Sequence, residues 1–446
     1  MSDVAIPDGW QQVKLGDVCS KVGSGSTPTG GKSVYVSSGY PIIRSQNVGY
    51  LQFLPDGLAY IANHDARKLR SVTVKPQDVL INITGDSVAR CCIAPDFGTD
   101  SFVNQHVCII RTDDALLLSG FLVYLLNSSK FQDVLLTIAS SGATRNALTK
   151  AHLESLQIPC PPVHEQKAIA HILGTLDDKI DQLRKTNSVL EDMASALFKS
   201  WFVDFDPVKA KQENRPTGLP KDLDDLFPDS FEDSALGPIP TGWRVTGLGD
   251  LVEVLSGGTP STSNASYWGG DIPWFSVKDT PALSDVWVID TEKHITQEGI
   301  TNSAAKILPP KTTIVSARGT VGKLALTSSD IAMNQSCYGL RNKNGRDHLF
   351  VYFTVRTLIN ALQQSSHGTV FDTITRQTID GLNCIVCGAS ESNAFEDAVT
   401  PNLSKMLSNI HQIRTLTNLR DTLLPKLISG DLRVPEAEQM VAELGL

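Results

Sequence analysis

The sequence predicts an α+β protein in which one globular domain occurs twice, and three observations lead to that prediction. Short motifs near the start of the chain recur in the same order in the second half. Each half carries short strand patterns separated by turns, and each ends in a long helical pattern with heptad spacing. Solenoid repeats span only roughly 20–50 residues. This much longer repeat therefore predicts two mixed α/β domains joined by two long antiparallel coiled-coil helices, a pseudo-two-fold internal repeat.

The repeated motifs contain Gly-Trp, Leu-Gly-Asp and Thr-Pro. They lie at residues 7–10, 15–17 and 24–28 in the first half, and at 240–243, 248–250 and 257–260 in the second. Later in each half, Asn104-Gln105 corresponds to Asn334-Gln335, and residues 140–142 correspond to 366–368. The repeat thus covers each predicted domain, which we place at 1–162 and 241–390.

The first domain is predicted from alternating strand and helix patterns. Strands are expected at 40–44, 78–83 and 106–110, because each segment is apolar or β-branched and is bounded by turn residues. A helix is expected at 115–136, where leucines follow one helical face. A closing strand at 156–160 is ended by prolines.

A long helix is predicted within residues 163–205. Its apolar residues recur with the spacing of a coiled-coil seam: Leu173, Leu176, Ile180, Leu183, Leu190, Ala194, Leu197 and Trp201. Asn187 occupies a seam position, where a polar residue fixes the register of paired helices at a cost in stability. The alternative is an ordinary amphipathic helix that tolerates one Asn.

Residues 206–240 are predicted to be an acidic, proline-rich linker. The prolines exclude a long helix, and the acidic residues favour a solvated, partly extended path. The prolines are Pro207, Pro216, Pro220, Pro228, Pro238 and Pro240.

The second half repeats this plan. Strands are expected at 272–276, 312–316 and 337–340, and a helix at 349–363. A second seam helix is predicted within 391–432, followed by a tail at 433–446. Its seam residues are Leu403, Met406, Ile410, Ile413, Leu416, Leu419, Leu423 and Leu427. Two such helices are expected to pack antiparallel and to set the separation of the domains.

Composition excludes some classes of protein. The 446 residues are 41% hydrophobic and 20% charged, as in soluble globular proteins. No run of 18 apolar residues predicts a membrane span, and the N-terminus does not resemble a signal peptide. Eight cysteines without a dense framework favour a cytoplasmic location. The net charge of −9 argues against nucleic acid as a partner, but the acidic residues concentrate in the linker and at the C-terminus.

Motifs for catalysis are mostly absent from the sequence. Residues 25–33 approach a phosphate-binding loop but have one residue too many before Lys32, and the second half has no Lys-Ser there. Cys384 and Cys387 form a lone C-x-x-C pair, which is weak support for zinc without a second pair. No metal site and no catalytic residue is therefore predicted.

Polar loops recur in both halves and suggest recognition of a ligand. Arg can read guanine, Asn and Gln can read adenine, and Ser and Thr can bind phosphate. The alternative for any one loop is an ordinary turn, and for the two Asn-Gln pairs a structural role is favoured. The candidate DNA-contacting residues are Ser26, Thr27, Arg44, Gln46, Asn47, Thr84, Thr144, Arg145 and Asn146 in the first half, and Thr259, Ser261, Lys278, Arg318, Thr320, Thr369 and Thr373 in the second.

From Trp10 to Arg433 the chain resembles the specificity subunit of type I restriction–modification enzymes. The resemblance rests on the repeated motifs, on Pro161-Pro162 with Glu165-Gln166 at the start of the first seam helix, and on residues 236–243. It implies that each domain is a target recognition domain reading one half of a split double-stranded DNA sequence. It also implies that the helices space the domains and dock the methyltransferase subunits.

The resemblance further implies a subunit without catalytic residues or bound cofactors. Two methyltransferase (modification) subunits would use S-adenosylmethionine, and up to two restriction subunits would use ATP and Mg. The candidate docking and seam residues are Leu176, Ile180, Leu183, Asn187, Leu190, Ile410, Ile413 and Leu423.

The second seam helix departs from the family pattern, because residues 387–393 lack the Pro-Pro and Glu-Gln start. This puts equivalent docking of the two modification subunits in doubt. The alternative function is a duplicated coiled-coil scaffold that binds protein without DNA specificity; a stand-alone enzyme is disfavoured by the absent motifs.

Overall fold

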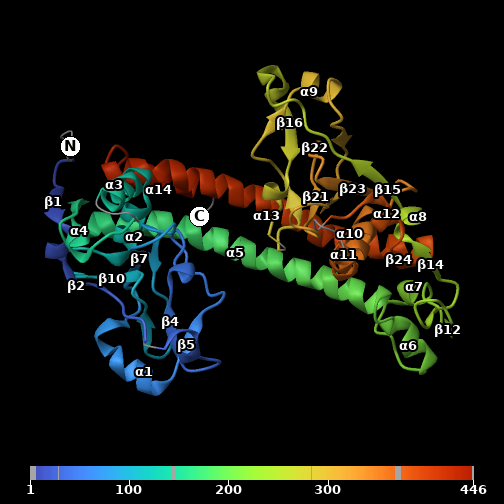
Figure 1. Cartoon of the computed structure of the whole chain (residues 1–446), viewed down its shortest axis with the longest axis horizontal. Coiled ribbons are helices and arrows are strands. Elements are labelled where there is room, and N and C mark those ends of the chain that lie inside the picture. Colours follow the sequence, from blue (N-terminus) through green and yellow to red (C-terminus); the bar gives the residue numbers. More distant parts are fainter. Residues whose placement is uncertain (1–6, 29, 142–145, 283, 367–372, 444–446) are drawn as a thin grey trace. The chain divides into compact units, whose positions relative to one another are not determined.

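The computed structural model describes residues 7–28, 30–141, 146–282, 284–366 and 373–443. The chain divides into two compact units, Met1–Ile180 with Thr415–Leu446 (unit 1) and Asp181–Arg414 (unit 2). Helices α5 (Val163–Phe202) and α13 (Ala389–Ser429) are the two long helices that the heptad patterns predicted, and each contributes to both units (Figure 1).

Unit 1 contains three sheets built from short strands. An antiparallel sheet has the order β2-β10-β7-β8, a mixed sheet has the order β3-β5-β4-β9-β6, and β1 pairs with β11. The strands are β1 (Gln11–Lys14), β2 (Cys19–Ser24), β3 (Tyr35–Val36), β4 (Tyr40–Ile43), β5 (Ala59–Ile61), β6 (Thr73–Val74), β7 (Val79–Asn82), β8 (Cys91–Ile93), β9 (Ser101–Val103), β10 (Val107–Thr112) and β11 (Gln157–Cys160).

Unit 2 repeats the central part of this topology, although the edge strands of its sheets differ. Its sheets have the orders β15-β23-β20-β21-β17 and β18-β16-β22-β19, and β14 pairs with β24. The one parallel pair of the mixed sheet also recurs, as β4 with β9 and as β16 with β22. The strands are β14 (Arg244–Gly247), β15 (Val252–Ser256), β16 (Trp268–Phe275), β17 (Trp287–Val288), β18 (His294–Ile295), β19 (Ile307–Leu308), β20 (Thr313–Ser316), β21 (Leu324–Thr327), β22 (Ile331–Met333), β23 (Cys337–Asn342) and β24 (Asn383–Val386).

The prediction of a single helix near the end of each domain is wrong, because each predicted segment forms two helices. In unit 1, α2 (Ser119–Asn127) ends before α3 (Ser129–Ser140), since Ser128 is extended with φ −63° and ψ 146°. In unit 2, α10 (His348–Thr357) is followed by α11 (Ile359–Ser366). The remaining helices are α1 (Asn63–Lys68), α4 (Lys150–Glu154), α6 (Asp206–Gln212), α7 (Lys221–Asp224), α8 (Leu248–Leu251), α9 (Gln297–Thr301), α12 (Arg376–Asp380) and α14 (Val434–Ala442).

The segment 206–240 is more ordered than its prolines suggested. It contains α6, α7 and the two-stranded β12 (Phe231–Glu232) and β13 (Ile239–Pro240). Val208, Phe227 and Ile239 are buried in the core of unit 2. The prediction of a solvated path is therefore wrong for these residues, because burial of their apolar side chains outweighs the local preference for an extended chain.

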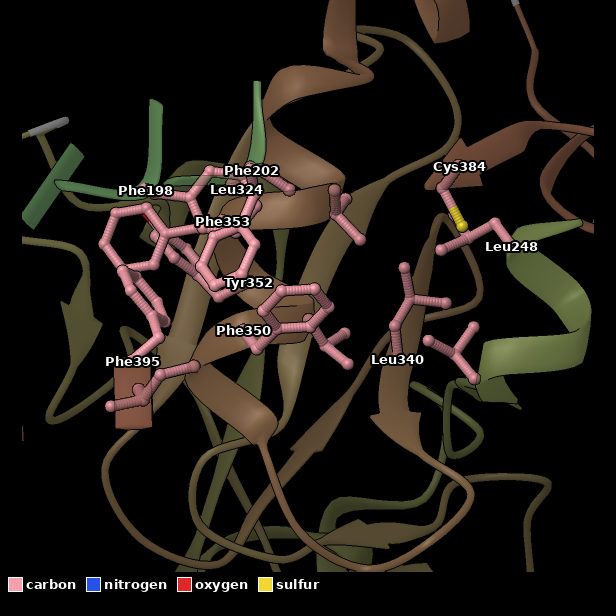
Figure 2. Packing of buried hydrophobic residues seen from close by; sticks show 14 of the residues in the cluster. Phe198, Phe202, Leu248, Leu324, Leu340, Phe350, Tyr352, Phe353, Cys384 and Phe395 are labelled. Carbon is pink, nitrogen blue, oxygen red and sulfur yellow. The ribbon is translucent and has the colours of Figure 1, made fainter. Parts of the chain in front are cut away.

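An aromatic cluster holds α5, α10 and α13 together within unit 2. Phe198 and Phe202 of α5 pack on Phe350 and Phe353 of α10 and on Phe395 of α13 (Figure 2). The ring centroids of Phe395 and Phe198 lie 5.3 Å apart at an interplanar angle of 73°. Edge-to-face pairs of this kind add to the stabilisation from burial alone.

The polar seam residue Asn187 has a buried partner. The Asn409 amide donates to Asn187 Oδ1 at 2.8 Å, and both side chains are fully buried in unit 2. Because Asn187 faces Asn409 while Phe198 faces Phe395, the two helices run antiparallel in this unit. Asn409 was not identified in the sequence, and its Oδ1 has no hydrogen-bond partner.

Replacing Asn409 with Leu is expected to destabilise unit 2 by about 1–3 kcal/mol, because the buried Asn187 amide loses its donor. The double variant N187L/N409L is expected to recover that loss, since an apolar pair suits a coiled-coil seam. Urea unfolding followed by tryptophan fluorescence measures both variants. A double variant as unstable as N409L alone would contradict a pairwise role for the two amides.

Candidate nucleic-acid interface

The Gly-Trp motif of each half is joined to the start of a long helix. The Trp10 indole donates to Glu165 Oε2 at 2.9 Å in unit 1. In unit 2 the Trp243 indole donates to Glu391 Oε1 at 3.1 Å. Glu391 therefore replaces Glu165 although the surrounding sequence differs, and the departure noted at residues 387–393 is smaller than the sequence suggested.

A real difference between the copies lies one residue further along each helix. In unit 1 the buried Gln166 accepts from Leu118 N at 2.8 Å and donates to Leu116 O and Pro161 O. In unit 2 the shorter Ser392 bonds to Asp347 Oδ2 instead, and it borders a cavity of about 350 Å³. The two helix starts are therefore held by different hydrogen bonds.

Polar loops in unit 1 are linked through the backbone. Gly25 N donates to Val107 O at 3.1 Å, and Ser26 N donates to Val103 O at 3.2 Å. A Cβ atom at Gly25 would lie 1.9 Å from Val103 O, so this close approach requires glycine. Ser26 and the neighbouring Thr27 are exposed on the resulting loop.

The loop that contains Thr84 joins the same group. The Thr84 hydroxyl lies 2.7 Å from His106 Nδ1, and Gly85 N approaches Asn146 O at 3.4 Å. The structure thus brings Thr84 and the exposed Asn146 together. The candidates Thr144 and Arg145 lie outside the described residues.

The turn at 44–47 adds Arg44 and Gln46, whose side chains both donate to Gly57 O. The Arg44 guanidinium also lies 5.5 Å from the Tyr35 ring centroid. Asn47 is fully buried, and its amide bonds to Arg44 N, Leu54 O and Asp56 O. The prediction that Asn47 contacts DNA is therefore corrected. Asn47 instead supports the turn, because its side-chain oxygen and nitrogen already form hydrogen bonds inside the protein.

Unit 2 repeats these loop connections. Asn334 N donates to Phe275 O as Asn104 N donates to Ile43 O, and Ala317 N donates to Ser336 O as Ile83 N donates to His106 O. The backbone bridge between Arg318 and Thr373 matches the bridge between Thr84 and Ala147. Among the residues that the structure describes, the repeated sequence therefore specifies the same backbone connections between corresponding loops in both units.

The candidate residues of unit 2 lie on these loops. Ser261, Lys278, Arg318 and Thr320 are exposed, while the Thr259 hydroxyl bonds to Gln335 Oε1. Thr373 lies beside Arg318, and Thr369 lies outside the described residues.

Some residues that hold the loops in place were not predicted from the sequence, and others were predicted only in part. Asn82 is buried and donates to Ser45 O and Val48 O, which fixes the turn beside it. Its place inside an apolar strand is a signal that could have identified it. The structural role favoured for the two Asn-Gln asparagines is confirmed, since Asn104 and Asn334 each accept from a backbone N–H two residues on.

The seam residues named for docking lie mainly inside the protein. Leu176, Ile180, Leu183, Asn187 and Leu423 are buried, and Leu190, Ile410 and Ile413 are half-buried. Asp177 of α5 accepts from Tyr124 of α2 at 2.6 Å and from Arg420 of α13 at 2.6 Å within unit 1. The contacts of Asp177 hold α5 against α2 and α13. The buried seam side chains leave little surface for a partner protein.

Metal ligands, cysteines and membrane-spanning helices were also sought in the described part of the chain. There, no group of three or more His, Cys, Asp or Glu side chains is placed to hold a metal ion. All eight cysteines are free thiols, and burial raises the pKa of Cys384 to about 11. Within the same residues, every helix is too short or too polar to cross a lipid bilayer.

Comparison with known proteins gives consistent matches. Residues 7–192 and 240–385 each match the family model described as the type I restriction modification DNA specificity domain. The HindI specificity subunit of Haemophilus influenzae is 25% identical, over 95% of this chain and 99% of that protein. The MjaIX specificity subunit of Methanocaldococcus jannaschii is 27% identical, over 97% of this chain and 95% of that protein. The crystal structure of a type I S subunit from M. genitalium has a similar fold, with a TM-score of 0.57 at 15% identity over 96% of this chain and 97% of that one.

Proposed function

The chain belongs to the type I restriction modification DNA specificity family, and on that premise we propose that each globular domain reads one half of a bipartite double-stranded DNA target. The observation that carries this proposal is the recurrence of the same loop connections in both units, with polar side chains on those loops. The loops offer Arg44 and Gln46 in unit 1, and Lys278 and Arg318 in unit 2. These side chains can contact base edges and phosphates.

The paired helices would set the spacing of the two half-sites and dock the methyltransferase subunits. Because the seam side chains are buried, docking falls to the exposed face of α5. Val189 and Met193 are 57% and 56% exposed there, one helical turn apart. Exposed apolar residues in such a stripe are typical of a surface that binds a partner.

Catalysis would belong to the partners of this subunit. The methyltransferase subunits would use S-adenosylmethionine, and a restriction subunit would use ATP and Mg. The net charge of −9 fits a subunit that shares its phosphate contacts with partners. An isolated chain that binds DNA with full affinity and a steep salt dependence would argue against this division of labour. The alternative of a protein-binding scaffold is not favoured, because both halves match a DNA specificity domain.

Exchanging residues 10–160 for the same segment of a relative tests the proposal. One half of the methylated sequence is expected to change while the other half and the spacer stay the same. Mapping of methylated adenines in a host that expresses the complex provides the measurement. The matched control exchanges 243–385, which should change the opposite half. If either exchange altered both halves together, one domain would not read one half-site.

A further inference from the structure

We propose that Trp268 is a positioning residue that holds the loop 258–261 of unit 2 in its reading conformation. The Trp268 indole donates to Ser261 O at 3.1 Å. The Trp274 indole donates to Gly258 O at 2.9 Å. The two rings meet edge to face with centroids 5.1 Å apart. This inference rests on the proposed function, because it assigns the loop to DNA reading.

The two indole hydrogen bonds add to the other contacts that hold this loop, such as that of Gly258 N with Met333 O. The loop residues are Gly258-Thr259-Pro260-Ser261, of which Gly, Pro and Ser are common turn formers. Gly258 is wedged so closely that a Cβ atom would lie 2.3 Å from the Ala304 carbonyl carbon. The two indoles fix the carbonyls at the ends of the loop, and Gln335 binds Thr259 between them. A loop ordered before binding loses less entropy when DNA binds.

Trp268 lies at the edge of a small core cluster, against which it packs. It is half-exposed, and it borders an open hollow of about 500 Å³ together with Thr262, Gly269, Lys293 and His294. The Lys293 ammonium lies 5.7 Å from the centroid of its ring. Trp274 is buried in this cluster with Ile295 and Ala332. Trp268→Phe therefore removes a tie to the loop and keeps an aromatic ring against the cluster.

Unit 1 holds its corresponding loop differently. Strand β4 has Ile42 where β16 has Trp274, as the matching pairs with Phe102 and Ala332 indicate. Trp10 is the only tryptophan in the sequence of unit 1, and its indole donates to Glu165. An indole tie is thus specific to unit 2, and its loss should affect one half-site only.

The test uses the full chain assembled with its methyltransferase subunits. Trp268→Phe keeps a ring on Trp274 but loses the indole N–H. Methylation rates are measured on duplexes that carry single base changes in either half of the mapped target. We expect discrimination to fall about fivefold in the half read by unit 2, the effect of one hydrogen bond, and to be unchanged in the other half.

Trp287→Phe is the matched control, because it loses an indole bond to Leu403 O elsewhere in unit 2 and should not alter discrimination. Trp274→Phe breaks the tie at Gly258 and tests the inference again if W268F does not fold. Unchanged discrimination in W268F, or an equal loss in both halves, would overturn it. A loop variant that keeps Gly258 separates this from the wider proposal: if T259A/S261A alters neither half-site, the loop does not read DNA.

Discussion

Replacing Phe395 with Ala is expected to lower the free energy of unfolding of unit 2 by about 3–5 kcal/mol, because a fully buried aromatic ring is removed and a cavity remains. Phe395 is 0% exposed and lies within 5.5 Å of the ring centroids of Phe198, Phe202 and Phe353 (Figure 2). It is the aromatic residue by which α13 joins the cluster, so its loss should loosen the pairing of α5 and α13 in this unit.

Tryptophan fluorescence during urea unfolding suits this measurement, because Trp201, Trp243, Trp268, Trp274 and Trp287 lie in unit 2 and only Trp10 lies in unit 1. Met193→Ala on the exposed face of α5 serves as the control. It should change the stability by less than about 0.5 kcal/mol. A loss below about 1 kcal/mol in F395A would mean that the cluster repacks without this ring.

Lowering the pH from about 6.5 to 4 is expected to destabilise unit 2 by up to about 3 kcal/mol through His348. Burial, together with the charges of Arg341 and Lys311, lowers the pKa of His348 from 6.5 to about 4. The Arg341 guanidinium lies 2.7 Å from His348 Nε2. A protonated His348 ring could not accept this hydrogen bond, because both of its nitrogens would carry a proton. Within this pH window the unfolded chain binds a proton that the folded chain does not, so stability falls as the pH falls.

His348→Gln separates this effect from other groups, since Gln can still accept from Arg341 but does not titrate. Glu396 contributes a dependence of the opposite sign, because burial raises its pKa. The measured quantity is the difference in unfolding free energy between wild type and H348Q at pH 7 and at pH 4.5. A difference that does not change with pH would contradict a neutral His348 in the folded protein.

The strands that were predicted from the sequence were located well because their signals are local. Apolar runs bounded by turn residues identified β4, β7, β10, β20 and β23. Sequence reasoning failed at Ser128, where the backbone leaves the helix between two segments with helical apolar patterns. It also failed at Val208 and Phe227, whose burial depends on residues far away along the chain. At Val208 and Phe227, contacts with the rest of the unit outweigh local preference.

The candidate site residues stay a prediction, and the structure shows where they lie. Lys278 and Arg318 are exposed on loops, as expected of charged residues in polar turns. The error at Asn47 has a physical reason, because an amide suits a base edge and a buried turn equally well. Trp268 was missed since a tryptophan in a strand normally signals core packing.

The sequence by itself determined that two related domains and two heptad helices are present, because repeats and apolar periodicity are written in neighbouring residues. Only the tertiary structure decided that Asn187 pairs with Asn409 and that Glu391 takes the place of Glu165. It alone joined loops through backbone hydrogen bonds in each unit and placed Trp268 against one loop of unit 2. Such contacts join residues far apart in the chain, and the packing of the whole unit selects them rather than any local pattern.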